Sequence, residues 1–512
     1  MLRTDVSSCS RTRYAAVLFA VTLCAALSAA PASVRAQDAG KQNGASPAKS
    51  DAVATWRAAR KFTIPRLVAH AAWCSDQKLR GERDRAYAGL LRLTPDHKRA
   101  RRVLKYTRGK DGNWRRRSYR APSLTTDDER GADVARRLSK AAVALRASVA
   151  ALRSDTQVPV ATREAAVREL AQIIYSDAKV RAWNGEVLLG TQWVLQETAV
   201  ALKEGKALRT AILKAFAEQP HPDAAEVQDD DKPYVARFAQ GAQNNFVRVL
   251  AMRGAATSVE SARVFAAAHT AFTRAIGAEP IPTVRPRLFL FNSKTDGLRA
   301  LGNHPSVNPA YLKWAGGLTS AWTPSGAMVF VWAADRPRRT EWCLRQALQL
   351  HLRTTLKINE KRGWAYEGVG HWMSGAMLGT HHSWYVRRDG YGNSAGSRDA
   401  RLAQLQEPNA GWMKVGASLA KSKEWPDLRV MLGRGINTMS VDELLASYLL
   451  ARFLIEGRPG QVHDVLTDVG AGVAPDAWCE RRLGVSLPTL DRRLRRWVGE
   501  MTARGRRSDR GR

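Results

Sequence analysis

Cysteine is scarce in this sequence, and its scarcity excludes two kinds of small, cross-linked domain. Only five of the 512 residues are cysteine, and Cys74, Cys343 and Cys479 are the three outside the N-terminal leader described below. An odd number of widely spaced cysteines is neither a disulfide framework nor a zinc-binding cysteine motif. The sequence leaves open whether two of them form one disulfide or all three are buried thiols.

Long apolar runs are also missing. Outside the leader, no stretch of the sequence reaches about 18 apolar residues, the length that a membrane-spanning helix requires. We therefore expect no transmembrane span. Hydrophobic residues still make up 45% of the chain, which is ample for packed cores in two or three domains.

Acidic residues are too few to balance the basic ones. The chain has 47 Asp and Glu against 81 Lys and Arg, a formal net charge of +34. Such a balance favours polyanions, so an acidic polymer is a possible partner. The basic residues are spread along the chain, for example at Arg99–Arg102, Arg115–Arg117 and Arg504–Arg512, and this spread favours a solvated basic surface over a dedicated binding face.

The N-terminus has the organisation of a cleavable secretion signal. Arg3, Arg11 and Arg13 form a basic region, Ala15–Ala29 an apolar core, and Val34–Ala36 a small-residue cleavage site. We expect export to a periplasmic or extracellular location, which argues against a specific nucleic acid as partner. Residues 1–36 contain four Arg and one Asp, so their removal lowers the formal net charge by three to +31.

Composition and periodicity divide the chain into six regions. We predict a signal peptide at 1–36, a disordered linker at 37–51, a helical hairpin at 52–119, a helical region at 120–232, a mixed domain at 233–499 and a disordered basic tail at 500–512. The fold class is α+β and predominantly helical, with a small mixed sheet packed on helices.

The region 52–119 contains one clear helical repeat unit. Small and large apolar residues alternate on successive helices, and Pro95 with Asp96 suits the start of the third. The pattern resembles a tetratricopeptide-type hairpin. Since such a unit cannot bury its apolar face alone, we expect it to dock on the rest of this chain or on a partner.

The most informative stretch is Thr340–Met373, which predicts two helices joined by a charged loop. Its second half, Trp364-Ala-Tyr-Glu367-Gly-Val-Gly-His371-Trp372, resembles the second motif helix of the gluzincin, or peptidase MA-like, zinc metallopeptidases. In that family the preceding helix carries His-Glu-x-x-His. The resemblance covers about 234–498 and implies a sheet whose edge strand holds extended substrate beside the cleft. We place that edge at Ala327–Trp332.

The positions of the family's zinc ligands and catalytic glutamate fall here on Arg345, Gln346 and Gln349. A guanidinium has no lone pair to give a metal, and a carboxamide cannot act as general base. We therefore expect no cofactor and no catalysis. A buried Glu367 would still need a cation, so we predict an Arg345–Glu367 contact. Alternatively, Glu367 merely lies at the start of its helix.

One enzymatic alternative uses shifted ligands for zinc: His351, Glu367 and His371. Glu367 and His371 are four residues apart and share a helix face. His351 is six residues beyond Arg345, which turns it to the opposite side of the first helix. We thus expect an exported, non-catalytic protein with a degenerate peptidase MA-like domain that binds a peptide or protein of the cell envelope. The alternatives are an active zinc metallopeptidase and a polyanion-binding basic protein.

Overall fold

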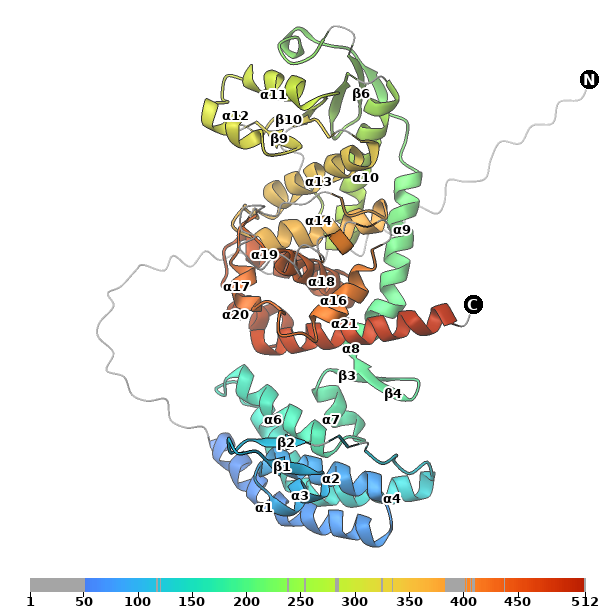
Figure 1. Ribbon diagram of the computed structural model, residues 1–512, viewed down its shortest axis with the longest axis vertical. Helices are drawn as coiled ribbons and strands as arrows, with labels where there is room; N and C mark the ends of the chain where they lie inside the picture. The colour runs from blue at the N-terminus through green and yellow to red at the C-terminus, as the bar shows by residue number, and fades with distance from the viewer. Residues whose placement is uncertain are drawn as a thin grey trace, which may run out of the picture. The chain divides into compact units, whose positions relative to one another are not determined.

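The computed structural model describes residues 51–510, apart from 117, 120, 237–238, 253–254, 281–284, 324–325, 334, 383–400, 402, 406, 408–409 and 437. The described chain is α+β and predominantly helical, as the sequence predicts, with a small mixed sheet packed on helices (Figure 1). The predicted signal at 1–36 and all but the last residue of the predicted linker at 37–51 lie outside the described residues.

The first helices pack around a core of their own. They are α1 (Asp51–Asp76), α2 (Arg80–Leu93), α3 (Lys98–Val103), α4 (Asp128–Ala141), α5 (Val143–Ser154), α6 (Val160–Ile173) and α7 (Ala178–Trp183), with a two-stranded hairpin of β1 (Tyr106–Arg108) and β2 (Trp114–Arg116). Leu67, Leu90, Leu145 and Leu170 are fully buried in this N-terminal core. The β1–β2 hairpin was not predicted, because its strands are only three residues long and mostly exposed.

A second, larger core begins earlier in the chain than predicted. After the hairpin of β3 (Glu186–Leu189) and β4 (Gln192–Leu195) come α8 (Gln196–Val200), a π-helical turn (Ala201–Gly205) and α9 (Lys206–Ala217). Leu195, Ala201 and Ile212 pack in this C-terminal core. The C-terminal core therefore takes residues from both the predicted helical region at 120–232 and the predicted mixed domain at 233–499. Helical periodicity shows which face of a helix is buried, not which core buries it.

The mixed sheet has six strands in the order β5-β6-β7-β8-β10-β9. They are β5 (Asp223–Ala225), β6 (Gln240–Gln243), β7 (Arg248–Ala251), β8 (Arg287–Leu290), β9 (Ser320–Trp322) and β10 (Met328–Val331). β8 is parallel to both β7 and β10, and β9 is antiparallel to β10. The predicted edge at Ala327–Trp332 is wrong: β10 is an interior strand, and β9 is the last strand of the sheet.

Along the chain, three helices connect strands of this sheet, and α10 covers one face of the sheet. They are α10 (Ala255–Ile276), α11 (Lys294–Gly302) and α12 (Pro309–Ala315). Val264, Phe265 and Phe272 of α10 pack with Val249 and Leu288 of the sheet in the C-terminal core. Asn308 caps α12, because its side chain accepts a hydrogen bond from the N–H of Tyr311.

The remaining helices complete the C-terminal core. They are α13 (Arg336–Thr355), α14 (Gly363–Met377), α16 (Trp412–Leu419), α17 (Leu428–Leu432), α18 (Val441–Gly457), α19 (Pro459–Gly470), α20 (Pro475–Trp478), a π-helical turn (Cys479–Leu483) and α21 (Leu487–Arg510). Ser440 and Glu443 form a capping box at the start of α18. The predicted disordered tail at 500–512 is wrong as far as residue 510, because α21 continues to Arg510.

Two features of the described chain bear on the expectations about cysteines and membranes. Cys74, Cys343 and Cys479 are all free and buried, which settles the alternatives in favour of three thiols. Nowhere in the described ranges is a helix long and apolar enough to cross a membrane.

Candidate functional site

Helices α13 and α14 pack against each other, as the resemblance implies. The side chain of Asp335 caps α13 by accepting a hydrogen bond from the N–H of Arg338, at 2.8 Å. Gly363 starts α14 where the chain approaches Gly435 closely: a Cβ there would lie 2.7 Å from the Gly435 carbonyl carbon. These two ends fix the helices that carry the motif residues.

Arg345 and Glu367 form a buried ion pair between the two helices. Arg345 Nη2 lies 2.7 Å from Glu367 Oε1, and the two side chains are 1% and 0% exposed. Arg345 Nη1 also donates to the backbone carbonyl of Glu367, at 3.3 Å. The predicted contact is confirmed. The guanidinium occupies space that no side chain could share, since a Cβ at Gly370 would lie 2.2 Å from Arg345 Nη1.

His371 approaches the other carboxylate oxygen of Glu367. Its Nε2 lies 3.2 Å from Glu367 Oε2, and the ring is fully buried beside Trp412, with ring centroids 4.9 Å apart. Burial, and then the charge of Arg345, hold the pKa of His371 well below its usual value. A neutral imidazole can donate one hydrogen bond to the carboxylate. Glu367 is thus held by a guanidinium on one side and an imidazole on the other.

The zinc ligands of the enzymatic alternative are not assembled. His351 lies on the far side of α13, where its ring packs against His269 and Phe272 with centroids 5.5 and 5.4 Å apart. In the described parts of the chain, no group of three His, Cys, Asp or Glu side chains could hold a metal ion. At a position that the resemblance assigns to the metal site, Arg345 places a permanent cation. The residues present do not fit zinc.

A cavity of about 370 Å³ lies beside the motif helices and against β9. Its walls include Gln346, Gln349 and Arg353 of α13, Tyr366 of α14, Ser320–Thr323, and Tyr311 and Trp314 of α12. Gln346 Nε2 donates to Ser320 Oγ at 2.8 Å, which ties α13 to β9. Arg353 lies over the ring of Trp322, 5.4 Å from its centroid. Gln346 and Gln349, on which the resemblance places motif positions, therefore line this cleft.

The outer edge of β9 runs along the cleft. On its inner side, Thr323 N–H donates to the Met328 carbonyl at 2.9 Å, and the Thr319 carbonyl accepts from Trp332 N–H at 3.0 Å. Backbone hydrogen-bonding direction alternates along an antiparallel strand, so the N–H and C=O groups of Ser320 and Trp322 point away from β10. The Tyr311 hydroxyl donates to the Trp322 carbonyl.

Comparisons with protein-family models, with curated proteins and with solved structures give no match.

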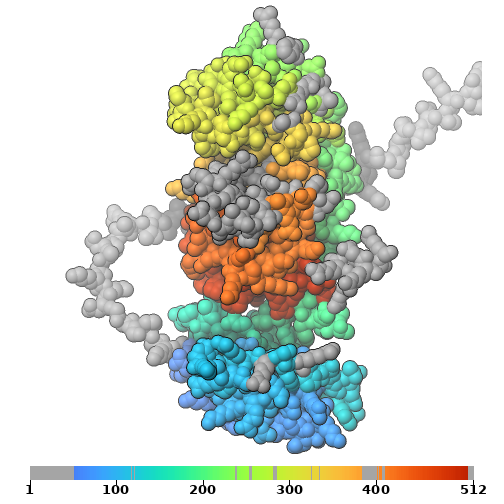
Figure 2. All heavy atoms as spheres, viewed as in Figure 1, coloured from blue at the N-terminus to red at the C-terminus, as the bar shows by residue number. Residues whose placement is uncertain are grey.

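The aromatic wall of the cleft was missed by the sequence reasoning. The rings of Tyr311 and Trp314 on α12 contact each other at a tilt of 48°, with centroids 5.0 Å apart, and Trp314 is 48% exposed. In the space-filling view, the yellow atoms of the α11–α12 region lie at the surface (Figure 2). A usable signal was present: Asn308 before Pro309 is a typical helix start. It would have placed the two aromatic residues on one short helix.

Proposed function

We propose that this chain is an exported, non-catalytic protein that binds an extended peptide segment of a cell-envelope partner in the cleft between β9 and α13. In this proposal the domain is peptidase MA-like and its zinc motif has degenerated. The observation that carries the proposal is the outward-facing backbone edge of Ser320 and Trp322 beside that cleft.

A peptide can add to this edge as a further strand. Ser320 directs an N–H and a C=O outward, which one residue of an antiparallel added strand can pair with, and Trp322 directs a further N–H outward two residues on. The carbonyl of Trp322 is already bonded to Tyr311, so the added strand would be short. Main-chain hydrogen bonds supply affinity in this mode, and the cleft supplies specificity.

The side chains around the edge suit apolar and polar peptide groups rather than bond cleavage. Trp314 and Trp322 offer aromatic surface, and Gln346 and Gln349 offer carboxamides at the position of the family's base and second ligand. A carboxamide cannot take a proton from water. The enzymatic alternative requires a ligand set, and neither His351, Glu367 and His371 nor the family positions provide one.

The edge can be tested with one substitution and one matched control. Ser320→Pro removes the outward N–H but leaves the β9–β10 ladder, whereas Ser320→Ala removes only the hydroxyl that Gln346 binds. Short peptides are first selected from a random library for binding to the wild-type chain. They should bind Ser320→Pro about tenfold more weakly, because they lose a backbone hydrogen bond and clash with the proline ring. Ser320→Ala should bind them nearly normally.

Two results would contradict the proposal. Selected peptides that bind both variants equally would place the site elsewhere. Peptides that the wild-type chain cleaves, detected by mass spectrometry, would make the protein an enzyme.

A further inference from the structure

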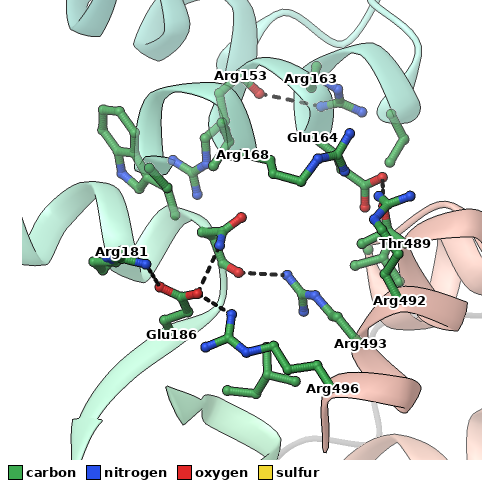
Figure 3. A pocket seen from close by; sticks show the side chains of 18 of the residues that line it. Arg153, Arg163, Glu164, Arg168, Arg181, Glu186, Thr489, Arg492, Arg493 and Arg496 are labelled. Atoms are coloured by element: carbon green, nitrogen blue, oxygen red, sulfur yellow. Dashed lines mark hydrogen bonds and ion pairs between the residues drawn. The ribbon is translucent and has the colours of Figure 1, made fainter. Parts of the chain in front are cut away.

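A second cavity, of about 790 Å³, lies between the two cores and is lined by arginine (Figure 3). One wall comes from α5, α6 and α7, and the other from the start of α21. The arginines are Arg153, Arg163, Arg168, Arg181, Arg492, Arg493 and Arg496, and the carboxylates are Glu164, Glu186 and Glu480. Seven cations against three anions leave an excess of four positive charges in the lining.

Three of the arginines are committed to structural pairs. Arg181 Nη1 lies 2.7 Å from Glu186 Oε2, and Arg496 pairs with the same carboxylate. Arg493 Nη1 lies 3.1 Å from an oxygen of Glu197. These pairs join β3 and α8 to α21. They explain part of the cluster without any ligand.

Four of the arginines lack such a partner. Within the described chain, no carboxylate lies at ion-pair distance from Arg153, Arg163, Arg168 or Arg492. Arg163 donates only to the backbone carbonyl of Arg153, at 3.4 Å, and its Nε is buried with no acceptor among the described atoms. The guanidinium of Arg153 lies over the ring of Trp183, 5.6 Å from its centroid. A buried, unsatisfied donor on a cation is costly, and an anion in the cavity would remove that cost.

Glu164 is engaged by groups other than these arginines. Its carboxylate accepts hydrogen bonds from the Ser486 N–H and hydroxyl and from the Thr489 hydroxyl. Arg492 Nη2 donates to the same Thr489 hydroxyl, at 2.5 Å. The carboxylate in the middle of the lining thus serves mainly to hold the start of α21, not to neutralise the guanidinium groups.

Arg168 and Arg492 face each other across the cavity and repel. Burial and then the charge of Arg168 lower the pKa of Arg492, and the attraction of Glu164 is the smaller effect. Like charges brought together at a cost to stability are typical of sites that take a ligand of the opposite charge.

We propose that this cavity binds a compact ligand with phosphate-type oxyanion groups, held by Arg163 and Arg168 of α6 and by Arg492 of α21. A phosphate group fits better than one carboxylate because its several oxygens can accept guanidinium donors from more than one direction. The inference does not rest on the peptide-binding cleft, which lies in another part of the chain.

Such a ligand would also join the two cores. Arg163 and Arg168 belong to a helix of the N-terminal core, and Arg492 to a helix of the C-terminal core. A bound anion would replace a repulsion across the seam by attraction on both sides. Ligand binding should therefore raise the unfolding temperature of the whole described chain.

The experiment uses the purified mature chain at low ionic strength, with inorganic pyrophosphate as the probe in calorimetric titration and thermal unfolding. The test variant is Arg168→Gln/Arg492→Gln. The matched control is Arg57→Gln/Arg80→Gln, which removes two exposed arginines from α1 and α2. We expect one saturable pyrophosphate site that weakens about tenfold or more in the test variant and is unchanged in the control. Without ligand, the test variant should unfold no earlier than the wild type.

Two further arms identify the source of the phosphate and its chemical class. Vesicles containing phosphatidylglycerol that bind the wild type but not the test variant would assign a lipid headgroup, and pyrophosphate binding alone would assign a free phosphate compound. Citrate, a carboxylate of similar charge, should bind more weakly than pyrophosphate. The proposal is overturned if neither pyrophosphate nor the vesicles bind saturably, or if citrate binds as tightly as pyrophosphate. It is also overturned if both double variants lose binding equally, or if the test variant is less stable than the wild type without ligand.

Discussion

At the scale of single residues, Arg345 is the side chain that determines the arrangement of the site. It places a permanent charge beside Glu367, and the carboxylate then needs no metal. This contact could be predicted, because a buried carboxylate requires a cation and α13 offered one at the correct position. The contact of His371 with the same carboxylate was not predicted as part of that pair, although its spacing of four residues from Glu367 was noted.

Removing one member of this pair should be costly. Arg345→Met leaves Glu367 buried without its cation and should lower the free energy of unfolding by about 3–5 kcal/mol. Arg345→Met/Glu367→Met removes both charges and should be clearly less destabilised than the single variant. Urea unfolding followed by tryptophan fluorescence measures both. A single variant as stable as the wild type would mean that the pair contributes little.

At the scale of helices and strands, periodicity located α13 and α14. The edge strand was misplaced for a physical reason. Met328–Val331 is a continuous apolar run, buried along its whole length, which is typical of an interior strand. The short Ser320–Trp322 is the edge. Strands β5 and β6, Asp-Ala-Ala and Gln-Gly-Ala-Gln, carry too few apolar residues to be predicted.

The packing of α13 on α10 should make stability depend on pH. Burial, and secondarily the neighbouring His269, lower the pKa of His351 to about 3. The unfolded chain takes up a proton on this ring below about pH 6.5, whereas the folded chain does not until about pH 3. Stability from this residue is therefore intact above pH 6.5 and is lost as the pH falls, by about 1.4 kcal/mol per pH unit.

Two variants isolate this titration. His351→Phe removes the imidazole that must stay neutral in the folded chain. Between pH 4.5 and 6 it should lower the slope of the unfolding free energy against pH by about 1.4 kcal/mol per pH unit, the equivalent of one proton. Phe272→Leu disturbs the same aromatic cluster without removing a titratable group, so its slope should equal that of the wild type. Denaturant unfolding across this pH range measures both. An unchanged slope in His351→Phe would show that the ring is not kept neutral by folding.

At the scale of the whole molecule, the basic residues have two roles, and the amino-acid composition alone does not show which residues have which role. Some arginines join the two cores in ion pairs, as Arg181 of α7 and Arg496 of α21 do through their shared carboxylate, Glu186. Others line the arginine-lined cavity, and among the described residues no carboxylate lies at ion-pair distance from them. The sequence could not reveal this cluster, because its two halves, 153–181 and 492–496, are about 300 residues apart and meet only when the two cores pack together.

The central claim is that a peptidase-like framework is kept here while its metal site has been replaced by an ion pair. The most direct test is the zinc content of the purified wild-type chain beside that of Arg345→His/Gln346→Glu/Gln349→His, which restores His-Glu-x-x-His opposite Glu367. We expect almost no zinc in the wild type and close to one zinc per chain in the folded variant. A wild type with near-stoichiometric zinc that is lost on Glu367→Ala, or a folded triple variant that binds none, would contradict the claim.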